Sequence, residues 1–169
     1  MNHIVLYHPE IPQNTGNIMR TCIANKMTLH LIEPLGFRLD SKHVKRSAVN
    51  YIDQVDYHVY PDWDSFVAQN DGEYYFLTRY GSVAPDQMDY THGSDVYLIF
   101  GAESTGIDKA ILKQHLDRCL RLPMAANVRS LNLSNAVAIL AYEVLRQQGF
   151  PGLSTHEPDS MKGKDYLLK

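Results

Sequence analysis

The most informative stretch of the chain is Leu122–Leu140, L-P-M-A-A-N-V-R-S-L-N-L-S-N-A-V-A-I-L, because in it a polar loop leads directly into an apolar helix. The start of a helix leaves backbone N–H groups unpaired, and Ser and Asn side chains satisfy them. More of these side chains follow one another than a single cap requires: Ser130, Asn132, Ser134 and Asn135. We therefore expect some of them to hold a ligand.

The predicted helix Leu133–Gln148 carries apolar residues at helical spacing and ends at Gly149. Further apolar residues widen its buried face: Ala136, Ile139 and Tyr142. The extra width fits two alternatives, an interface between subunits or deep burial within one chain.

The rest of the chain alternates short apolar runs with helical patterns, which is typical of a parallel α/β sheet. The expected strands are His3–Tyr7, Thr28–Ile32, Val55–Val59, Tyr74–Leu77, Val96–Phe100 and Cys119–Leu122. The expected helices between them are Thr15–Lys26, Ser41–Tyr51, Trp63–Gln69 and Lys109–Leu116, and three of them follow residues suited to capping: Asn14, Asp62 and Asp108. We expect one domain over residues 1–153 and a polar, mobile tail over residues 154–169.

Composition argues against several classes of protein. The net charge of −3 disfavours a protein that coats nucleic acid generally, so any RNA contact must be local. Cys22 and Cys119 lie far apart in apolar patterns, which indicates reduced core thiols and no metal site. We see no secretion signal and no apolar run long enough to cross a bilayer, so we expect a cytoplasmic protein that binds no membrane.

Three segments follow expected strands, at the edge where an open α/β sheet binds its ligand. The first is Pro9–Arg20, P-E-I-P-Q-N-T-G-N-I-M-R, in which Asn17 and Arg20 share a helix face. We expect Arg20 over the loop end of the sheet. The alternative is an ordinary surface arginine on a solvated helix. The third segment is the loop and helix start quoted above.

The second segment, Leu98–Ile107, reads L-I-F-G-A-E-S-T-G-I. Ile107 stands where a phosphate loop requires lysine, and neither a G-x-G-x-x-G turn nor the hydrolase elbow G-x-S-x-G is present. Gly101 and Gly106 instead fit a close approach of backbone to a ligand, with Glu103 at the rim. An ordinary turn between strand and helix is the alternative.

Together the three segments resemble the motifs of the SPOUT superfamily of RNA methyltransferases. Asn14 with Arg20, then F-G-A-E-S-T-G, then R-S-L-N-L-S-N-A-V occur in the order of that family. Within it, the opening I-V-L-Y-x-P-E-I-P-x-N-T-G-N-I-x-R is similar to that of the small tRNA 2′-O-methyltransferases acting on the wobble ribose. The likeness runs from the N-terminus to about Gly152.

The resemblance implies a parallel, three-layer α/β fold with a C-terminal trefoil knot, which the general rules of chain connection would not predict. It also implies a homodimer formed through the knotted region and a pocket for S-adenosylmethionine (AdoMet). Carried onto this sequence, the pocket residues are Leu77, Thr78, Gly101, Leu122, Met124, Ser130 and Leu131. No metal is expected, because the sulfonium already activates the methyl group.

The implied reaction is attack by a ribose 2′-oxygen on the methyl carbon of AdoMet. The substrate is the wobble nucleotide in a tRNA anticodon stem-loop, a cytidine or modified uridine, with leucine tRNAs expected. The implied catalytic residues are Arg20, Asn14, Glu103, Ser130 and Asn132. Because a guanidinium stays protonated, Arg20 is suited to orient ribose and phosphate as a fork donor and is poorly suited to be a general base.

Local positive charge is expected to contact RNA phosphates. Lys42, Lys45 and Arg46 share a short helical segment with His43, and Arg129 lies in a motif loop. Solvated surface charge is the alternative for each. Three aromatic residues are candidates for stacking on an unpaired base, with ordinary packing as the alternative: Tyr7, Phe37 and Tyr80.

Two other functions stay open. One is methylation of another tRNA or rRNA ribose, although related rRNA enzymes often carry a separate RNA-binding domain for which this chain has no room. The other is a non-catalytic module that binds cofactor and RNA. The complete catalytic set argues against the second alternative.

Overall fold

The computed structural model describes residues 1–49 and 52–169. Its centre is a six-stranded sheet with the strand order β3-β2-β1-β5-β4-β6. The strands are β1 (Asn2–Tyr7), β2 (Thr28–Ile32), β3 (Tyr57–Tyr60), β4 (Glu73–Leu77), β5 (Val96–Phe100) and β6 (Cys119–Leu120). All neighbouring pairs run parallel, so the carboxyl ends of all strands meet at one edge. The predicted parallel α/β fold is confirmed.

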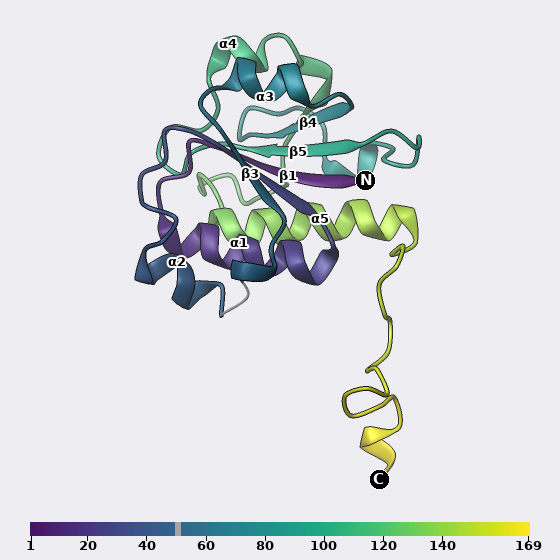
Figure 1. Ribbon diagram of the computed structural model, residues 1–169. Coiled ribbons are helices and arrows are strands. Elements are labelled where there is room, and N and C mark those ends of the chain that lie inside the picture. Colours follow the sequence, from purple (N-terminus) through teal and green to yellow (C-terminus); the bar gives the residue numbers. More distant parts are fainter. Residues whose placement is uncertain (50–51) are drawn as a thin grey trace.

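Helices cover both faces of the sheet (Figure 1). One face carries α1 (Pro12–Asn25) and α5 (Leu133–Gln148), with α2 (Lys42–Ser47) packed on α1. The other face carries α3 (Trp63–Gln69) and α4 (Lys109–Leu112). Side chains alternate along β1, so that Ile4 and Leu6 belong to the core under α1 and α5 while Val5 belongs to the core under α3.

The start of α1 differs from the prediction. The helix begins at Pro12, three residues before the expected Thr15, because proline fits the first helical position, where its missing N–H costs nothing. Asn14 is therefore not the cap, and its side chain is free to bond elsewhere. The predicted caps Asp62 and Asp108 do accept hydrogen bonds, from the backbone N–H of Ser65 at 2.7 Å and of Ala110 at 3.0 Å.

Several other boundaries differ from the prediction, among them the end of β6, which lies at Leu120 and not at Leu122. Ser41 caps α2, but the helix ends at Ser47, and the last two residues of the expected span, 50 and 51, lie outside the described residues. The helix α4 stops at Leu112, and a 3₁₀ turn occupies Leu116–Arg118. The edge strand β3 is shifted toward Tyr60, because its extent is set by pairing with β2.

Both cysteines are buried and unpaired, which confirms core thiols. Burial raises the pKa of Cys22 to about 12, so its thiol stays protonated. Within residues 1–49 and 52–169, no helix combines the length and apolar character needed to span a bilayer.

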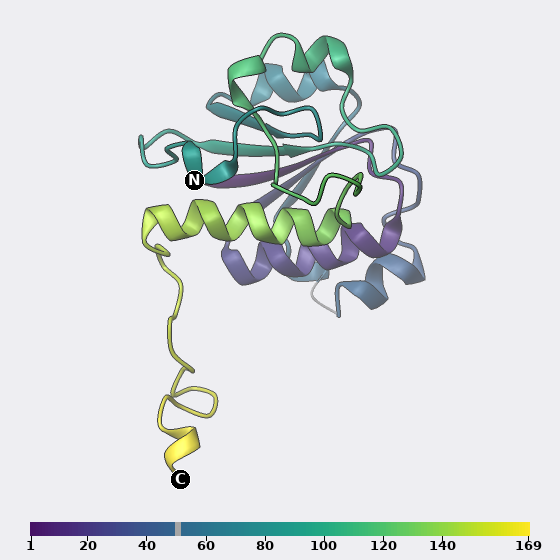
Figure 2. The same ribbon diagram turned by 180° about the vertical axis from the view of Figure 1, so that it is seen from behind.

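After β6 the chain crosses from the far edge of the sheet to the start of α5, beside α1 (Figure 2). Beyond α5 it leaves the body of the protein, and residues 154–169 extend away from it (Figure 1). The Lys26 Nζ donates to the carbonyl oxygen of Gly152 at 2.8 Å, close to the point of departure.

Candidate active site

Glu103 ties the loop after β5 to the start of α1. Its carboxylate accepts hydrogen bonds from the backbone N–H of Glu10 at 2.8 Å and of Ile11 at 3.1 Å. The side-chain amide of Asn14 donates to the same carboxylate at 3.3 Å. Ile11 is the N-cap of α1 but makes no side-chain cap, so a carboxylate from another segment serves the helix start, where negative charge is favourable.

Asn132 ties the start of α5 to the start of α1. Its side-chain oxygen accepts from the backbone N–H of Ser134 at 3.0 Å and of Asn135 at 3.3 Å, which caps α5. Its side-chain amide donates to the side-chain oxygen of Asn14 at 3.0 Å. Glu103, Asn14 and Asn132 thus form one hydrogen-bonded chain, the Asn14 network, in which the three sequence segments meet.

The polar residues at the start of α5 divide into two groups. Asn132 is the cap, and the Ser134 hydroxyl donates to the same oxygen at 2.6 Å, so both have structural duties. Arg129 and Ser130 are exposed in the preceding loop. Asn135 is also exposed, and only its backbone N–H takes part in the cap. Of the side chains that exceed the needs of capping, Ser130 and Asn135 are therefore the ones open to a ligand.

Four of the expected AdoMet-pocket residues, Leu77, Thr78, Gly101 and Leu122, lie at or just after the carboxyl ends of β4, β5 and β6, while Met124, Ser130 and Leu131 belong to the loop that leads to α5. The register places Leu77 beside both Phe100 and Leu120. The backbone N–H of Thr78 donates to the carbonyl oxygen of Leu120 at 2.9 Å, which joins β4 to β6 at this edge. Most of the seven are half-buried: Leu77, Thr78, Gly101, Leu122 and Met124. Ser130 and Leu131 are exposed.

Position 101 requires glycine because the backbone of the following loop packs directly against it. A Cβ at this position would lie 2.3 Å from the carbonyl carbon of Gly106, and Ala102 and Gly106 form an antiparallel bridge. Gly106 has a φ of +71°, in the left-handed region that favours glycine. The close approach predicted for a ligand is thus made by the loop itself, which folds back and holds Glu103 in place.

Arg20 lies apart from the Asn14 network. Gln13, Asn17 and Arg20 share one face of α1 and line a hollow of about 370 Å³ between α1 and α2, the α1–α2 hollow. Because a helix rises 1.5 Å per residue, Arg20 is about 9 Å along the axis from Asn14. The expectation that Arg20 lies over the loop end of the sheet needs correction, since it lies past the middle of α1.

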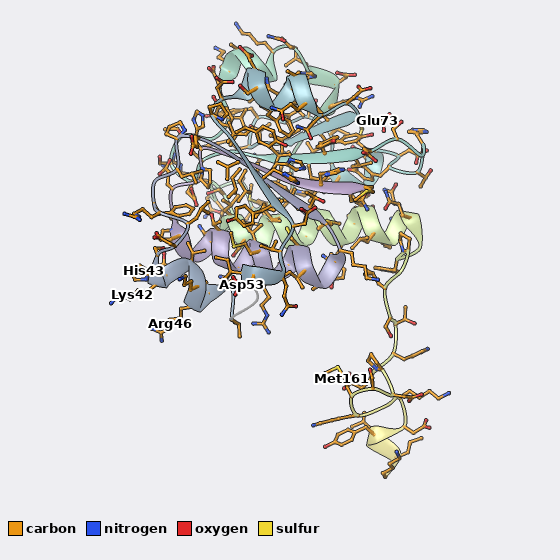
Figure 3. The ribbon with its side chains drawn as sticks, viewed as in Figure 1. Lys42, His43, Arg46, Asp53, Glu73 and Met161 are labelled. Carbon is orange, nitrogen blue, oxygen red and sulfur yellow. The ribbon has the colours of Figure 1, made fainter. Side chains whose placement is uncertain are left out.

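The other wall of the α1–α2 hollow comes from α2, through His43, Arg46 and Ser47. Gly16 allows this close packing, because a Cβ there would lie 2.5 Å from the Cβ of Ser47. Figure 3 shows Lys42, His43 and Arg46 projecting from α2 at one corner of the molecule. The basic segment predicted to bind RNA is thus beside Arg20.

The charge of the α1–α2 hollow suits an anion. Arg20 and Arg46 face it from two helices, and among residues 1–49 and 52–169 no acidic residue lines it. The side-chain nitrogen of Gln13 lies 3.4 Å from the Nδ1 of His43 and links the two walls.

Gln13 and Glu10 take part in the site although the sequence patterns did not indicate them. The spacing of Gln13, four residues before Asn17 and seven before Arg20, could have placed it on the same helix face. Glu10 accepts a hydrogen bond from the Ser104 hydroxyl at 2.6 Å, a second tie between the first two segments. No local pattern predicts that contact, because it joins residues far apart in the chain.

A model of the SpoU rRNA methylase family matches residues 1–142. The chain belongs to this family. SpoU-family relatives include a protein of Geobacillus stearothermophilus, provisionally named a tRNA (cytidine(34)-2′-O)-methyltransferase, which is 50% identical over 154 residues covering 90% of this chain and 98% of the relative. The tRNA (cytidine(34)-2′-O)-methyltransferase of Escherichia coli K12 is 41% identical over 154 residues, which cover 90% of this chain and 97% of that protein.

Solved SpoU-type structures share the fold. A structure described as giving insight into 2-OH methylation of C/U34 on tRNA superposes with a TM-score of 0.81 at 38% identity, covering 88% of this chain and 97% of that one. The AdoMet-bound rRNA methyltransferase of Sinorhizobium meliloti has a TM-score of 0.77 at 23% identity, covering 86% of this chain and 56% of that one. The second likeness concerns the fold alone.

Proposed function

We propose that this SpoU-family protein transfers the methyl group of AdoMet to the ribose 2′-hydroxyl of the wobble nucleotide in a tRNA anticodon loop. The nucleotide is a cytidine or modified uridine, with leucine tRNAs as expected substrates. The observation that carries the proposal is the Asn14 network, because it joins all three motif segments at the ligand-binding edge of the sheet. Relatives that share up to 50% identity over nearly their whole length support the choice of reaction.

The strand ends suit AdoMet as the methyl donor. Leu77, Leu122 and Met124 offer half-buried apolar surface, and the adjoining strand ends offer backbone groups, as a nucleoside pocket requires. When bound, AdoMet supplies a methyl group on a positively charged sulfur, whose bond to carbon breaks as the ribose oxygen bonds to that carbon. Ser130 and Leu131 would close the pocket from the exposed loop before α5.

The protein's own residues have to hold the RNA and orient its ribose. Arg20 and Arg46 in the α1–α2 hollow would bind the backbone phosphate next to the reacting ribose, and by anchoring this phosphate Arg20 would orient the ribose. Lys42, Lys45 and Arg129 would contact neighbouring phosphates. The Asn14 network is the positioning element, because it fixes the start of α1 against the strand-end loops. Holding both reactants in line is worth roughly 7–11 kcal/mol when the geometry is good.

A trefoil knot is part of the proposal. Leu120 and Arg121 lie between two segments, since Leu120 accepts from the N–H of Thr78 at the end of β4 and Arg121 donates its N–H to the oxygen of Val83 at 2.9 Å. After Arg121 the chain continues to α5, on the face of the sheet that carries α1 (Figure 2). In a knot of this kind, the C-terminal part of the chain passes through an earlier loop, here between the end of β4 and the loop around Val83.

A homodimer through α5 and the loop before it is also part of the proposal. Ala136 is buried within the chain, whereas the side chains of Ile139 and Tyr142 are 47% and 50% exposed. Of the two alternatives for the wide apolar face, burial within one chain leaves these two side chains uncovered. Leu131 and Val128 extend the exposed apolar surface beyond the start of the helix.

We assign the methyltransferase domain to residues 1–153 and regard residues 154–169 as a mobile tail. We also place the enzyme in the cytoplasm, where tRNA is modified.

Incubation of the purified protein with methyl-labelled AdoMet and total tRNA, followed by nucleotide mapping, tests the function. Label in the 2′-O-methyl group of nucleotide 34 supports it. Label in another tRNA or rRNA ribose would favour the first alternative. Binding of AdoMet and tRNA without any transfer would favour the non-catalytic module.

A further inference from the structure

The structure separates the three aromatic residues considered for base stacking. The ring of Tyr7 stacks on His8 with centroids 3.8 Å apart and meets the edge of Trp63. Phe37 is partly buried against the core. Tyr80 is 79% exposed and lies at the edge of the sheet where the proposed site is found. Only Tyr80 of the three offers an open ring.

One side of the Tyr80 ring is supported by a cation. The guanidinium carbon of Arg79 lies 5.5 Å from the ring centroid, in the range of a cation–π contact. With one face supported in this way, the exposed remainder of the ring is available to a flat partner.

The turn that carries Tyr80 is fixed to β6. The backbone N–H of Gly81 donates to the carbonyl oxygen of Thr78 at 3.2 Å, and that of Ser82 donates to the oxygen of Cys119 at 3.3 Å. A Cβ at Gly81 would lie 2.4 Å from the carbonyl carbon of Leu120, so the turn lies directly against the strand. A side chain presented by such a turn needs little ordering before it binds a ligand.

Arg121 adds a second guanidinium next to Arg79 and Tyr80, and these three residues form a cluster. Arg121 donates to the carbonyl oxygen of Arg79 at 2.6 Å, across 42 positions of sequence. Arg121 precedes Leu122, and Tyr80 follows Thr78 by two residues, so the cluster adjoins residues assigned above to the AdoMet pocket. The turn therefore carries an open aromatic ring with one guanidinium over it, and a second guanidinium is bonded to the backbone of the residue before the ring. Exposed aromatic rings combined with positive charge are the means by which proteins hold unpaired nucleotides.

We propose that Arg79, Tyr80 and Arg121 form a stacking platform for an unpaired base of the RNA next to the methylated nucleotide. The base stacks on the open face of Tyr80, and Arg121 contacts the adjoining phosphate. The inference rests on the proposed function and adds to it a substrate-binding subsite. Stacking tolerates any base, so the platform selects for an unpaired loop rather than for a sequence.

Steady-state kinetics with an anticodon stem-loop test the platform. Tyr80→Ala should raise the KM for RNA about 10-fold, as expected for loss of one base–aromatic stack. Tyr80→Phe keeps the ring and should keep the KM. The Kd for AdoMet should be the same in all variants. Tyr166→Ala removes a different exposed tyrosine, in the tail, and serves as the matched control.

A fluorescent base separates this inference from the proposed function. Stem-loops with 2-aminopurine at single loop positions should lose fluorescence on binding wild-type protein at one position, and should keep it with Tyr80→Ala. Unchanged quenching and KM in Tyr80→Ala, with wobble methylation intact in wild type, would overturn the platform and leave the function standing. Loss of AdoMet binding in Tyr80→Ala would also overturn it, by placing the ring in the cofactor pocket. Absence of wobble methylation in wild type, with quenching retained, would instead reject the proposed function.

Discussion

Asn132 donates a hydrogen bond to Asn14 at 3.0 Å across 118 positions of sequence, while its own oxygen caps α5. One side chain therefore fixes the starts of two helices relative to each other. Asn14 in turn donates a hydrogen bond to Glu103, whose carboxylate also accepts from the backbone N–H of Glu10 just before α1. The relative positions of the three motif segments depend on this chain of polar contacts.

Replacing Asn132 by aspartate separates its two duties. Asn132→Asp keeps an oxygen to cap α5 but has no N–H for Asn14, so we expect a loss of about 1–2 kcal/mol in the free energy of unfolding and at least a 10-fold lower kcat. Asn132→Ala also loses the cap and should cost about 1 kcal/mol more. Urea unfolding and methyl-transfer assays measure both. The control is Ser134→Ala, which removes the hydroxyl that donates to the side-chain oxygen of Asn132. Wild-type stability and activity in Asn132→Asp would contradict the positioning role.

Arg20→Ala should abolish methyl transfer and leave AdoMet affinity nearly unchanged, because Arg20 lies in the α1–α2 hollow and away from the strand-end residues. Single-turnover assays with saturating RNA and calorimetric AdoMet binding measure the two effects. Arg118→Ala is the matched control, since Arg118 pairs with Glu73 at the start of β4, at the opposite edge of the sheet. Full turnover by Arg20→Ala would remove Arg20 from the reaction.

Reversing the charge of Lys45 and Arg46 together should weaken tRNA binding and make it less sensitive to salt. Each lost phosphate contact should reduce the slope of log K against log salt by about 1. Filter binding between low and physiological salt gives the slope. The control reverses Lys109 and Lys113, which lie at α4 on the other face of the sheet. An equal slope in both double variants would rule out α2 as an RNA contact.

Ile139→Asp should convert the protein to a monomer, because a charge on the exposed apolar face of α5 cannot be buried against a second copy. Sedimentation velocity over a concentration series measures the effect. Val67→Asp, on α3, is the control, since Val67 is 42% exposed and Ile139 is 47% exposed. If wild type and Ile139→Asp sediment alike, α5 is not the interface.

Acid should destabilise the fold through buried histidines. Burial is the main cause that lowers the pKa of His30 to about 3, with contributions from His3 and His58 that outweigh the opposing effect of Asp56. Burial likewise lowers the pKa of His3. Below the unfolded value near 6.5 the unfolded chain therefore binds more protons, so stability falls with decreasing pH down to about pH 3.

Urea unfolding at pH 7.5 and pH 5 measures this loss, about 1.4 kcal/mol per pH unit for each proton taken up. His30→Asn should show a smaller decrease between the two pH values, even though it starts from a lower stability through loss of the contacts to His3 and Tyr60. His92→Asn, an exposed histidine, should behave as wild type. Equal pH dependence in His30→Asn and wild type would show that another group is responsible.

The positions of the elements followed largely from local patterns. Buried parallel strands such as β5 are continuous apolar runs, and helices such as α5 carry their spacing and caps within a few residues, so neighbouring residues are enough to place them. The predicted boundaries were wrong where one residue type fits two positions. Asn14, for example, suits a helix cap but lies inside α1, which begins at Pro12.

Local patterns in the sequence were enough to predict the alternation of strands and helices, the buried thiols, and the three polar segments that follow strands. The tertiary structure alone decided which polar side chains meet: Asn132 with Asn14, Glu103 with the start of α1, and Arg20 with Arg46 across a separate hollow. The physical reason is that these contacts depend on how helices pack across the sheet. A shared helix face predicts neighbours along one helix, but side-chain partners on different elements are set by the packing of the whole core.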